Sequence, residues 1–292
     1  MPKVSVIIPT FNRSDVIVNR ALKSALAQNY EDYEVIVVDD ASEDNTQGIL
    51  KDYPIRYFRL DKNSGSSSAP RNKGIREAKG KYIVFVDDDN EILPNFLLKT
   101  TEVLDSNSDI KAVVTGRIIQ QRGFEDYATP KITKFTSIDW GWLMRREVFD
   151  EILYDENIKG DEDTDFGIAF FKKYKVVVID DYLQVAYDTE KGDDQRSNCF
   201  PSEARLRGLD YFLKKNIHEY RDDPDNLRYI YRLAGRNFYW GGYKVKGLRY
   251  FWKSFMAKKT IRSFLHFFVV LFGWSIYDRF MSLEERLIAK FR

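Results

Sequence analysis

Three consecutive aspartates, Asp87, Asp88 and Asp89, follow an apolar segment at residues 81–86 and precede Asn90. Neighbouring carboxylates repel one another, which raises the free energy of ionising each of them. A divalent cation relieves this repulsion, and carboxylate oxygens are the hard ligands that magnesium or manganese prefers when it bridges to phosphates. The alternative interpretation is a solvated acidic turn, because Asp and Asn are common turn formers. Taken alone, these aspartates favour neither interpretation.

Two further carboxylates, Asp39 and Asp40, lie just after the apolar segment 34–38. A carboxylate in that position can accept a hydrogen bond from a ring N–H of a base such as uracil, and helix capping is the alternative. The motif Pro9-Thr10-Phe11-Asn12-Arg13 follows the first apolar segment of the chain. Phe11 is a candidate to stack on the same base and Arg13 to lie near phosphate, and the alternative for Phe11 is an ordinary packed aromatic.

Residues 63–74 join a loop of small residues to a predicted helix start that contains Arg71. Backbone N–H groups at a helix start and an arginine are both suited to binding a phosphate. The segment is not a P-loop, because no Gly-Lys-Ser/Thr follows it, and the chain has no GxGxxG motif for a dinucleotide. An ordinary flexible loop is the alternative.

The acidic run 161–165 precedes an apolar segment at residues 166–171. A hydroxyl group is a poor nucleophile near neutral pH, and a partly desolvated carboxylate beside it can remove its proton during attack. Asp161, Glu162, Asp163 and Asp165 are all candidates for this role. The alternative for any of these acids is the favourable interaction of a carboxylate with a helix N-terminus.

Alternating strand-like and helix-like segments must position these residues. We expect strands at residues 4–8, 34–38, 81–86 and 111–119 and a weaker strand at 55–60, and helices at 18–26, after a cap at 42–44, at 94–104 and at 167–174. This order predicts an α/β fold with a mostly parallel sheet and helices on both sides. Ligands of such sheets bind beyond the carboxyl ends of the strands, where the polar motifs lie.

The strand pattern stops near residue 200, so we expect two domains, 1–200 and 201–292. The second is predicted to be helical at residues 203–215, 227–240, 245–257 and 261–277. Residues 226–292 contain 14 Lys and Arg and 3 Asp and Glu, which gives this region a net charge of +11 and leaves −10 for the first 225 residues. An acidic region that holds cations and a basic region that faces anions are therefore expected.

Composition restricts the class of protein. The single cysteine, Cys199, excludes an intrachain disulfide and a zinc site built from cysteines. The first apolar run is too short for a signal peptide, and the longest, 264–277, is shorter than the ~20 residues that span a bilayer. We therefore expect a cytoplasmic protein, with contact at the inner membrane surface as an added hypothesis.

Together the motifs resemble those of the family 2 glycosyltransferases, inverting enzymes with the GT-A fold. The resemblance covers about residues 3–190. It rests on five ordered segments, which are 4–13, 37–46, 63–74, 87–89 and 162–166. Residues 154–156, Tyr-Asp-Glu, also resemble a Phe-Asp-Glu that usually precedes the last segment.

The resemblance implies a role for each candidate residue. Residues implied to bind the nucleotide-sugar, with a UDP-sugar favoured, are Pro9, Phe11, Arg13, Asp40, Arg71, Asp87 and Asp88. It further implies that Asp89 ligates Mn²⁺ or Mg²⁺ and that Asp163 is the general base for a single displacement that inverts the anomeric centre. Glu162 and Asp165 are implied to support the acceptor pocket or the base. Many members carry a histidine after the final strand, where this chain has Asp188 as a candidate substitute.

Two other functions stay open: a sugar nucleotidyltransferase, and a non-catalytic glycan-binding protein on the same fold. The implied partners are a nucleotide-sugar donor and a glycan or lipid-linked acceptor, and no nucleic-acid motif is present. For the basic, aromatic C-terminal region we weigh an interfacial helix at residues 264–277 on a membrane against a helical hairpin that covers the sheet or contacts another copy.

Overall fold

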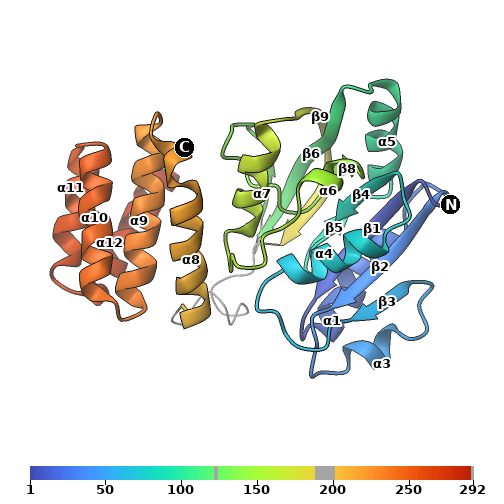
Figure 1. Ribbon diagram of the computed structural model, residues 1–292, viewed down its shortest axis with the longest axis horizontal. Coiled ribbons are helices and arrows are strands. Elements are labelled where there is room, and N and C mark those ends of the chain that lie inside the picture. The colour runs from blue at the N-terminus through green and yellow to red at the C-terminus, as the bar shows by residue number, and fades with distance from the viewer. Residues whose placement is uncertain (122–123, 188–200, 291–292) are drawn as a thin grey trace. The chain divides into compact units, whose positions relative to one another are not determined.

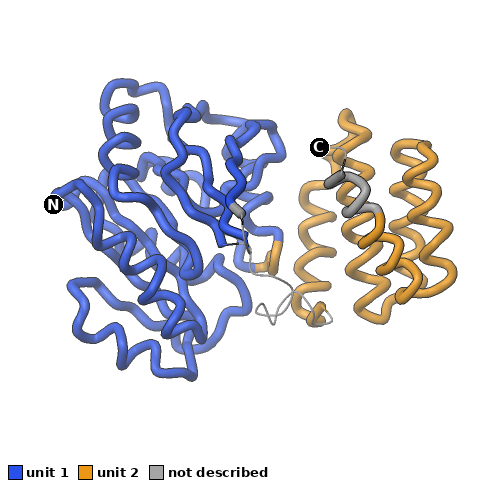
Figure 2. Tube along the Cα trace, turned by 180° about the vertical axis from the view of Figure 1, so that it is seen from behind, with its two compact units in different colours: residues 1–156, 161–197 blue, residues 157–160, 198–292 orange. Residues whose placement is uncertain are grey.

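A computed structural model describes residues 1–121, 124–187 and 201–290 of the chain. The chain forms two compact units (Figure 2). The first consists of Met1–Glu156 and Asp161–Ser197, and the second of Asn157–Gly160 and Asn198–Arg292.

The first unit is built on one mixed sheet, with strand order β3-β2-β1-β4-β8-β6-β9-β5 and β7 paired to β6 (Figure 1). The strands are β1 (Val4–Thr10), β2 (Tyr33–Asp39), β3 (Arg56–Arg59), β4 (Tyr82–Phe85), β5 (Glu91–Ile92), β6 (Ile110–Gln121), β7 (Phe124–Ala128), β8 (Trp142–Arg145) and β9 (Lys175–Tyr187). Strands β3, β2, β1 and β4 run parallel, as their apolar sequences predicted. Strand β8 is antiparallel to both of its neighbours, β4 and β6, and was not predicted.

Helices cover both faces of this sheet (Figure 1). They are α1 (Ser14–Ile17), the π-helical turn η1 (Val18–Leu22), α2 (Lys23–Leu26), α3 (Thr46–Leu50), α4 (Ser68–Glu77), α5 (Phe96–Ser106), α6 (Val148–Glu151) and α7 (Glu162–Phe171). Side chains of β1 alternate between two buried clusters, because successive residues of a strand point to opposite faces. Val6 and Ile8 pack in one cluster with residues of η1, α2 and α5, while Ile7 packs in the other with residues of α4, α6 and α7.

The second unit is helical. Its elements are α8 (Glu203–Asn216), the 3₁₀ turn η2 (Ile217–Tyr220), α9 (Pro224–Trp240), α10 (Lys244–Ala257), α11 (Ile261–Val270) and α12 (Trp274–Lys290). Three of the four predicted helices are confirmed, but the prediction of one helix over 261–277 is wrong. Gly273 has φ of +106°, a conformation that glycine adopts without steric cost, and it separates α11 from α12. None of the helices in the described ranges is both long enough and apolar enough to cross a membrane.

Helix α7 lies unusually close to the segment that precedes β8. Gly167 faces the backbone of Thr136, and the amide of Ile138 donates to the carbonyl oxygen of Asp163 at 3.1 Å. A side chain at residue 167 would overlap the Thr136 carbonyl oxygen. Glycine at this position therefore sets how closely the first turn of α7 approaches the sheet.

We expect Gly167→Ala to lower the free energy of unfolding by ~1–3 kcal/mol, because backbone rather than a mobile side chain must move. Gly48→Ala is the matched control in another helix, since its added methyl would meet only the side chain of Asn45. Urea unfolding of both variants measures the difference. Equal stability of the two variants would contradict the close approach at Gly167.

Candidate active site

The loops after β1 and β2 are joined at the carboxyl edge of the sheet. Asn12 and Ala41 both have left-handed backbone conformations, with φ of 53° and 64°. The amide of Asn12 donates to the hydroxyl oxygen of Ser42 at 2.8 Å, and the amide of Glu43 donates to the side-chain oxygen of Asn12 at 2.7 Å. Residues with positive φ other than glycine are uncommon and concentrate at functional sites. These contacts fix the two loops that carry Phe11, which is half-buried, and Asp40.

The adjacent aspartates at the end of β2 have different surroundings. Asp39 is buried, and its carboxylate accepts hydrogen bonds from Ser42, from the Tyr57 hydroxyl at 2.6 Å and from Arg59 at 2.7 Å. The Asp39 charge contributes, after burial, to raising the pKa of Tyr57 to about 12. Asp39 therefore ties β2 to β3. Asp40 instead accepts from the amide and hydroxyl of Ser64, at 2.9 and 3.0 Å, and faces the loop that precedes α4.

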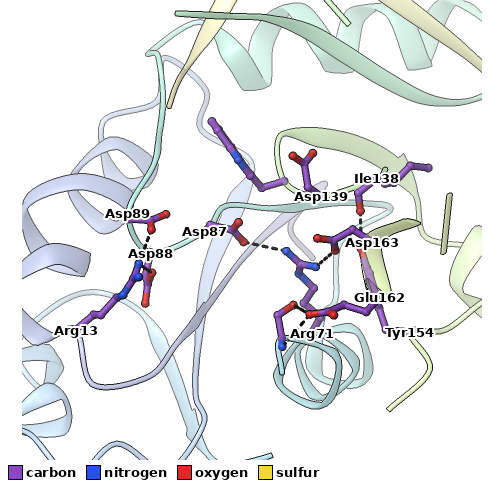
Figure 3. Close-up of polar contacts among 12 residues, drawn as sticks. Arg13, Arg71, Asp87, Asp88, Asp89, Ile138, Asp139, Tyr154, Glu162 and Asp163 are labelled. Carbon is purple, nitrogen blue, oxygen red and sulfur yellow. Dashed lines mark hydrogen bonds and ion pairs between the residues drawn. The ribbon is translucent and has the colours of Figure 1, made fainter. Parts of the chain in front are cut away.

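The aspartates that follow β4 are divided between two arginines (Figure 3). Arg13 forms ion pairs with Asp88, at 3.0 Å, and with Asp89. The Thr10 hydroxyl also donates to Asp88 at 2.8 Å. Burial is the main cause that raises the pKa of Asp88 to about 6, against the lowering effect of Arg13. The sequence predicted that Arg13 and these aspartates lie at the same edge of the sheet, and it indicated no role for Thr10.

Arg71 lies between Asp87 and Asp163 (Figure 3). Its guanidinium is 2.9 Å from Asp87 and forms a second ion pair with Asp163, and its side chain is 1% exposed. The guanidinium also stacks over the rings of Phe85 and Tyr154, with 5.6 and 5.1 Å to the ring centroids. A buried arginine is tolerated only when its charge is compensated. Arg71 thus joins the first turn of α4 to the residues that follow β4 and to the first turn of α7.

Asp163 lies in the first turn of α7. This helix begins at Glu162, earlier than the predicted start at residue 167, so its first turn includes Glu162, Asp163 and Asp165. Burial raises the pKa of Asp163 to about 7; Arg71 acts in the opposite direction, while Glu162 and Asp87 raise the pKa further. Its side chain nevertheless remains 30% exposed. The carboxylate combines a raised pKa with access to a reactant, the two properties needed in a general base near neutral pH.

The neighbours of Asp163 are structural supports. Glu162 accepts from the hydroxyl of Ser67 at 2.8 Å, which fixes the start of α4. Asp165 is buried. Asn72 exchanges hydrogen bonds with the backbone of Tyr154, at 2.9 and 3.1 Å, and thereby holds the aromatic ring under Arg71. Pro9 is buried within β1, opposite Val38 of β2.

A further ion pair, which the sequence did not predict, lies near Asp163. Arg117 of β6 contacts both oxygens of Asp139, at 2.8 and 2.6 Å, and stacks over Trp140. The Asp139 charge contributes to raising the pKa values of Asp87 and Asp163. The segment Asp139-Trp140-Gly141 carries a local sequence signal, because a glycine near an acid is typical of a turn. In the structure Gly141 has φ of +72° just before β8. The pairing with a residue 22 positions away has no local signal.

The site carries an excess of negative charge. Six carboxylates lie here with four arginines; the carboxylates are Asp87, Asp88, Asp89, Asp139, Glu162 and Asp163, and the arginines are Arg13, Arg20, Arg71 and Arg117. Carboxylate oxygens are the type of ligand that hard divalent cations prefer. Among the described residues, no three His, Cys, Asp or Glu side chains converge as a metal site. Asp188, the candidate substitute for the family's histidine, lies outside the described residues.

The family model "Glycosyl transferase family 2" matches residues 5–177. The chain belongs to glycosyl transferase family 2. This membership confirms the resemblance inferred from the five motifs, and it favours a transferase over a sugar nucleotidyltransferase.

Two relatives within glycosyl transferase family 2 come from Staphylococcus aureus. The poly(ribitol-phosphate) beta-N-acetylglucosaminyltransferase TarP of strain N315 is 44% identical over 230 residues, which cover 75% of this chain and 62% of TarP. The poly(ribitol-phosphate) beta-N-acetylglucosaminyltransferase TarS of strain Mu50 is 29% identical over 221 residues, which cover 69% of this chain and 38% of TarS. The chain therefore spans less than two thirds of the length of these relatives.

Solved structures confirm the predicted GT-A type of fold. The crystal structure of S. aureus TarS 1-349 in complex with UDP-GlcNAc superposes with a TM-score of 0.58 at 21% identity and covers 89% of this chain and 77% of that one. The mannosyltransferase PcManGT of Pyrobaculum calidifontis, in complex with GDP-Man and Mn²⁺, superposes with a TM-score of 0.56 at 19% identity and covers 99% and 85%.

The two arginines form a matched pair for mutation, because each bridges two aspartates but only Arg71 is buried. We expect Arg71→Met to lower the free energy of unfolding by ~3 kcal/mol or more at neutral pH, since two partly desolvated carboxylates lose their partner. Arg13→Met is expected to cost less, because the side chain of Arg13 is 22% exposed and water replaces it.

The loss in Arg71→Met should also depend on pH. The folded-state pKa values of Asp87 and Asp163 already lie above their ordinary values, and removal of Arg71 raises them further. A carboxyl whose pKa is raised in the folded state destabilises the fold progressively as pH rises from its ordinary pKa to the raised value, so the deficit should shrink on acidification. Urea unfolding at neutral and mildly acidic pH tests this, and equal losses in the two arginine variants would contradict the organising role of Arg71.

Proposed function

We propose that this chain is an inverting glycosyltransferase that moves a sugar from a UDP-sugar to a hydroxyl group of a glycan or lipid-linked acceptor. The observation that carries the proposal is the position of Asp163, a carboxylate with a pKa of about 7 that is joined through Arg71 to Asp87. Family membership and the relatives named for transfer of N-acetylglucosamine support it. A hexose or an N-acetylhexosamine is the transferred sugar in this proposal.

In the proposed donor site, the uracil ring binds between the loops after β1 and β2. Phe11 stacks on the base and the Asp40 carboxylate accepts its ring N–H, in place of the hydrogen bonds from Ser64. Pro9 shapes the floor of this site and Arg13 faces the diphosphate. Asp87 and Asp88 then lie next to the ribose and the donor sugar. The UDP-GlcNAc in the TarS structure is consistent with this class of donor.

In the proposed reaction, the acceptor hydroxyl attacks the anomeric carbon on the face opposite the diphosphate. Asp163 takes the hydroxyl proton while the bond from the anomeric carbon to the diphosphate oxygen breaks, which releases UDP and inverts the anomeric centre. Arg71 acts through its two aspartates, because its buried guanidinium fixes the distance between the donor-side carboxylate and the base. Glu162 and Asp165 support the turn that carries Asp163.

Asp89 is the residue we propose to hold Mn²⁺ or Mg²⁺. A cation held by Asp89 would supply Lewis-acid neutralisation of the charge that develops on the diphosphate. The excess of carboxylates over arginines supports this assignment, and so does the 35% exposure of the Asp89 side chain. The cytoplasm stays the predicted location.

Substitution of the base tests the proposal. We expect Asp163→Asn to lower kcat by about 10²–10⁴-fold, because an amide cannot accept the hydroxyl proton. Calorimetric titration with UDP and Mn²⁺ should give a dissociation constant close to that of the wild type, since the base is proposed to act on the acceptor. Asp52→Asn, the removal of an exposed aspartate on the first unit, is the control for a general effect of charge.

Two results would contradict parts of this proposal separately. A fully active Asp163→Asn variant would remove Asp163 as the base and leave the activity standing. A wild-type protein that binds no nucleoside diphosphate in the presence of Mn²⁺ would contradict the transferase itself and favour a non-catalytic glycan-binding role.

A further inference from the structure

Helix α11 of the second unit exposes an apolar face. Six side chains on this helix and the turn after it are 38–82% exposed; they are Ile261, Phe264, Leu265, Phe268, Leu271 and Phe272, and we call them the α11 apolar surface. Their spacing repeats every three to four residues, so they share one side of the helix. Aromatic contacts continue along it, with ring centroids of Phe264 and Phe268 5.8 Å apart and those of Phe268 and Phe272 5.1 Å apart.

The inner face of α11 is mixed, because Val270 is buried and Phe267 and Val269 pack against the same core. Ser263 and His266 are buried beside them, where Ser263 donates to the carbonyl oxygen of Lys258 at 2.7 Å and His266 hydrogen-bonds the Tyr277 hydroxyl at 3.1 Å. A helix that only covers a core in water is apolar on the inside and polar on the outside. The outward apolar surface is therefore not explained by the packing of the second unit. Contiguous exposed apolar patches of this kind mark interaction sites.

Positive charge surrounds this surface. Residues 244–270, which include α10 and α11, contain seven Lys and Arg and no Asp or Glu. Lys258, Lys259 and Arg262 are exposed next to the apolar side chains, and Lys258 pairs with Asp225 at 2.6 Å. Trp252 of α10, 48% exposed, also contacts Phe267 of α11 ring to ring. Apolar and aromatic side chains flanked by cations are the composition that binds at the boundary between headgroups and acyl chains of an anionic bilayer.

We propose that the α11 apolar surface docks the second unit on an anionic phospholipid membrane. The helix lies along the bilayer surface, with Phe264 and Phe268 inserted below the headgroups and Lys259 and Arg262 facing lipid phosphates. This peripheral contact replaces the hypothesis of one interfacial helix over 264–277, because the chain turns at Gly273. The proposal does not rest on the proposed glycosyltransfer.

Charge favours a membrane over a second copy of the same surface. In a symmetric pair residue i of one copy contacts residue j of the other, and because residues 244–270 contain no Asp or Glu, α10 and α11 of the second copy would offer Lys259 and Arg262 no carboxylate partner. Like charges across an interface oppose association. An anionic bilayer instead presents phosphate to the same cations, and each Lys or Arg near the surface strengthens the attraction.

Vesicle co-sedimentation of the full chain tests the proposal. We expect the wild type to pellet with vesicles of phosphatidylcholine and phosphatidylglycerol at low salt, and to pellet much less with phosphatidylcholine alone or at high salt. Phe264→Ser with Phe268→Ser should abolish pelleting, and Lys259→Glu with Arg262→Glu should reduce the partition coefficient roughly tenfold or more. Tyr127→Ser, which changes a 52% exposed aromatic of the first unit, is the matched control and should pellet like the wild type.

Wild-type protein that stays in the supernatant at low salt would overturn the proposal, as would pelleting that both pairs of substitutions leave unchanged. Sedimentation velocity without vesicles provides the second readout. Self-association that Phe264→Ser with Phe268→Ser abolishes, without vesicle binding, would show that another copy covers this surface. Thermal melting of each variant checks that α11 still folds, because the substituted side chains all point outward.

Discussion

The ion bridge from Arg71 to Asp87 and Asp163 is the interaction on which the geometry of the site depends. It joins residues from three segments that are far apart in the sequence: the first turn of α4, the end of β4 and the first turn of α7. Burying a guanidinium is costly unless carboxylates compensate its charge, so the bridge forms only when all three elements are in place. The separation of the base from the donor-side aspartate is thereby set by the fold and not by a flexible loop.

Neighbouring aspartates in this chain have separate tasks because their strands deliver them to different surroundings. Asp39 completes the contact between β2 and β3, while Asp40 faces the loop before α4. Asp87 faces Arg71 and its successors face Arg13. A sheet edge that collects several carboxylates raises the pKa of some of them, and two arginines offset only part of that repulsion. The remaining negative charge supports the proposal that this edge holds a divalent cation.

Much of this arrangement was predictable from the sequence. Strands β1, β2 and β4 are short and almost fully apolar, which indicates burial on both faces in a parallel sheet, and the polar motifs follow them directly. Strand β8 was missed because a strand of four residues carries little periodic signal and its partners lie far away in the sequence. The pairing of Arg117 with Asp139 and the burial of Arg71 depend on tertiary packing, so no local pattern reveals them. The prediction of one helix over 261–277 was wrong because the chain turns at Gly273, within a run of apolar residues.

The central claim is that the fold holds Asp163 as a carboxylate able to accept a proton near neutral pH. The most direct measurement is a carbon-13 NMR titration of the aspartate side-chain carboxyls, with the Asp163 signal assigned by its loss in Asp163→Asn. We predict that the carboxyl of Asp163 titrates with a midpoint of about 7, because burial and neighbouring carboxylates raise its pKa more than Arg71 lowers it. A midpoint near the ordinary aspartate value of 3.8 would contradict it.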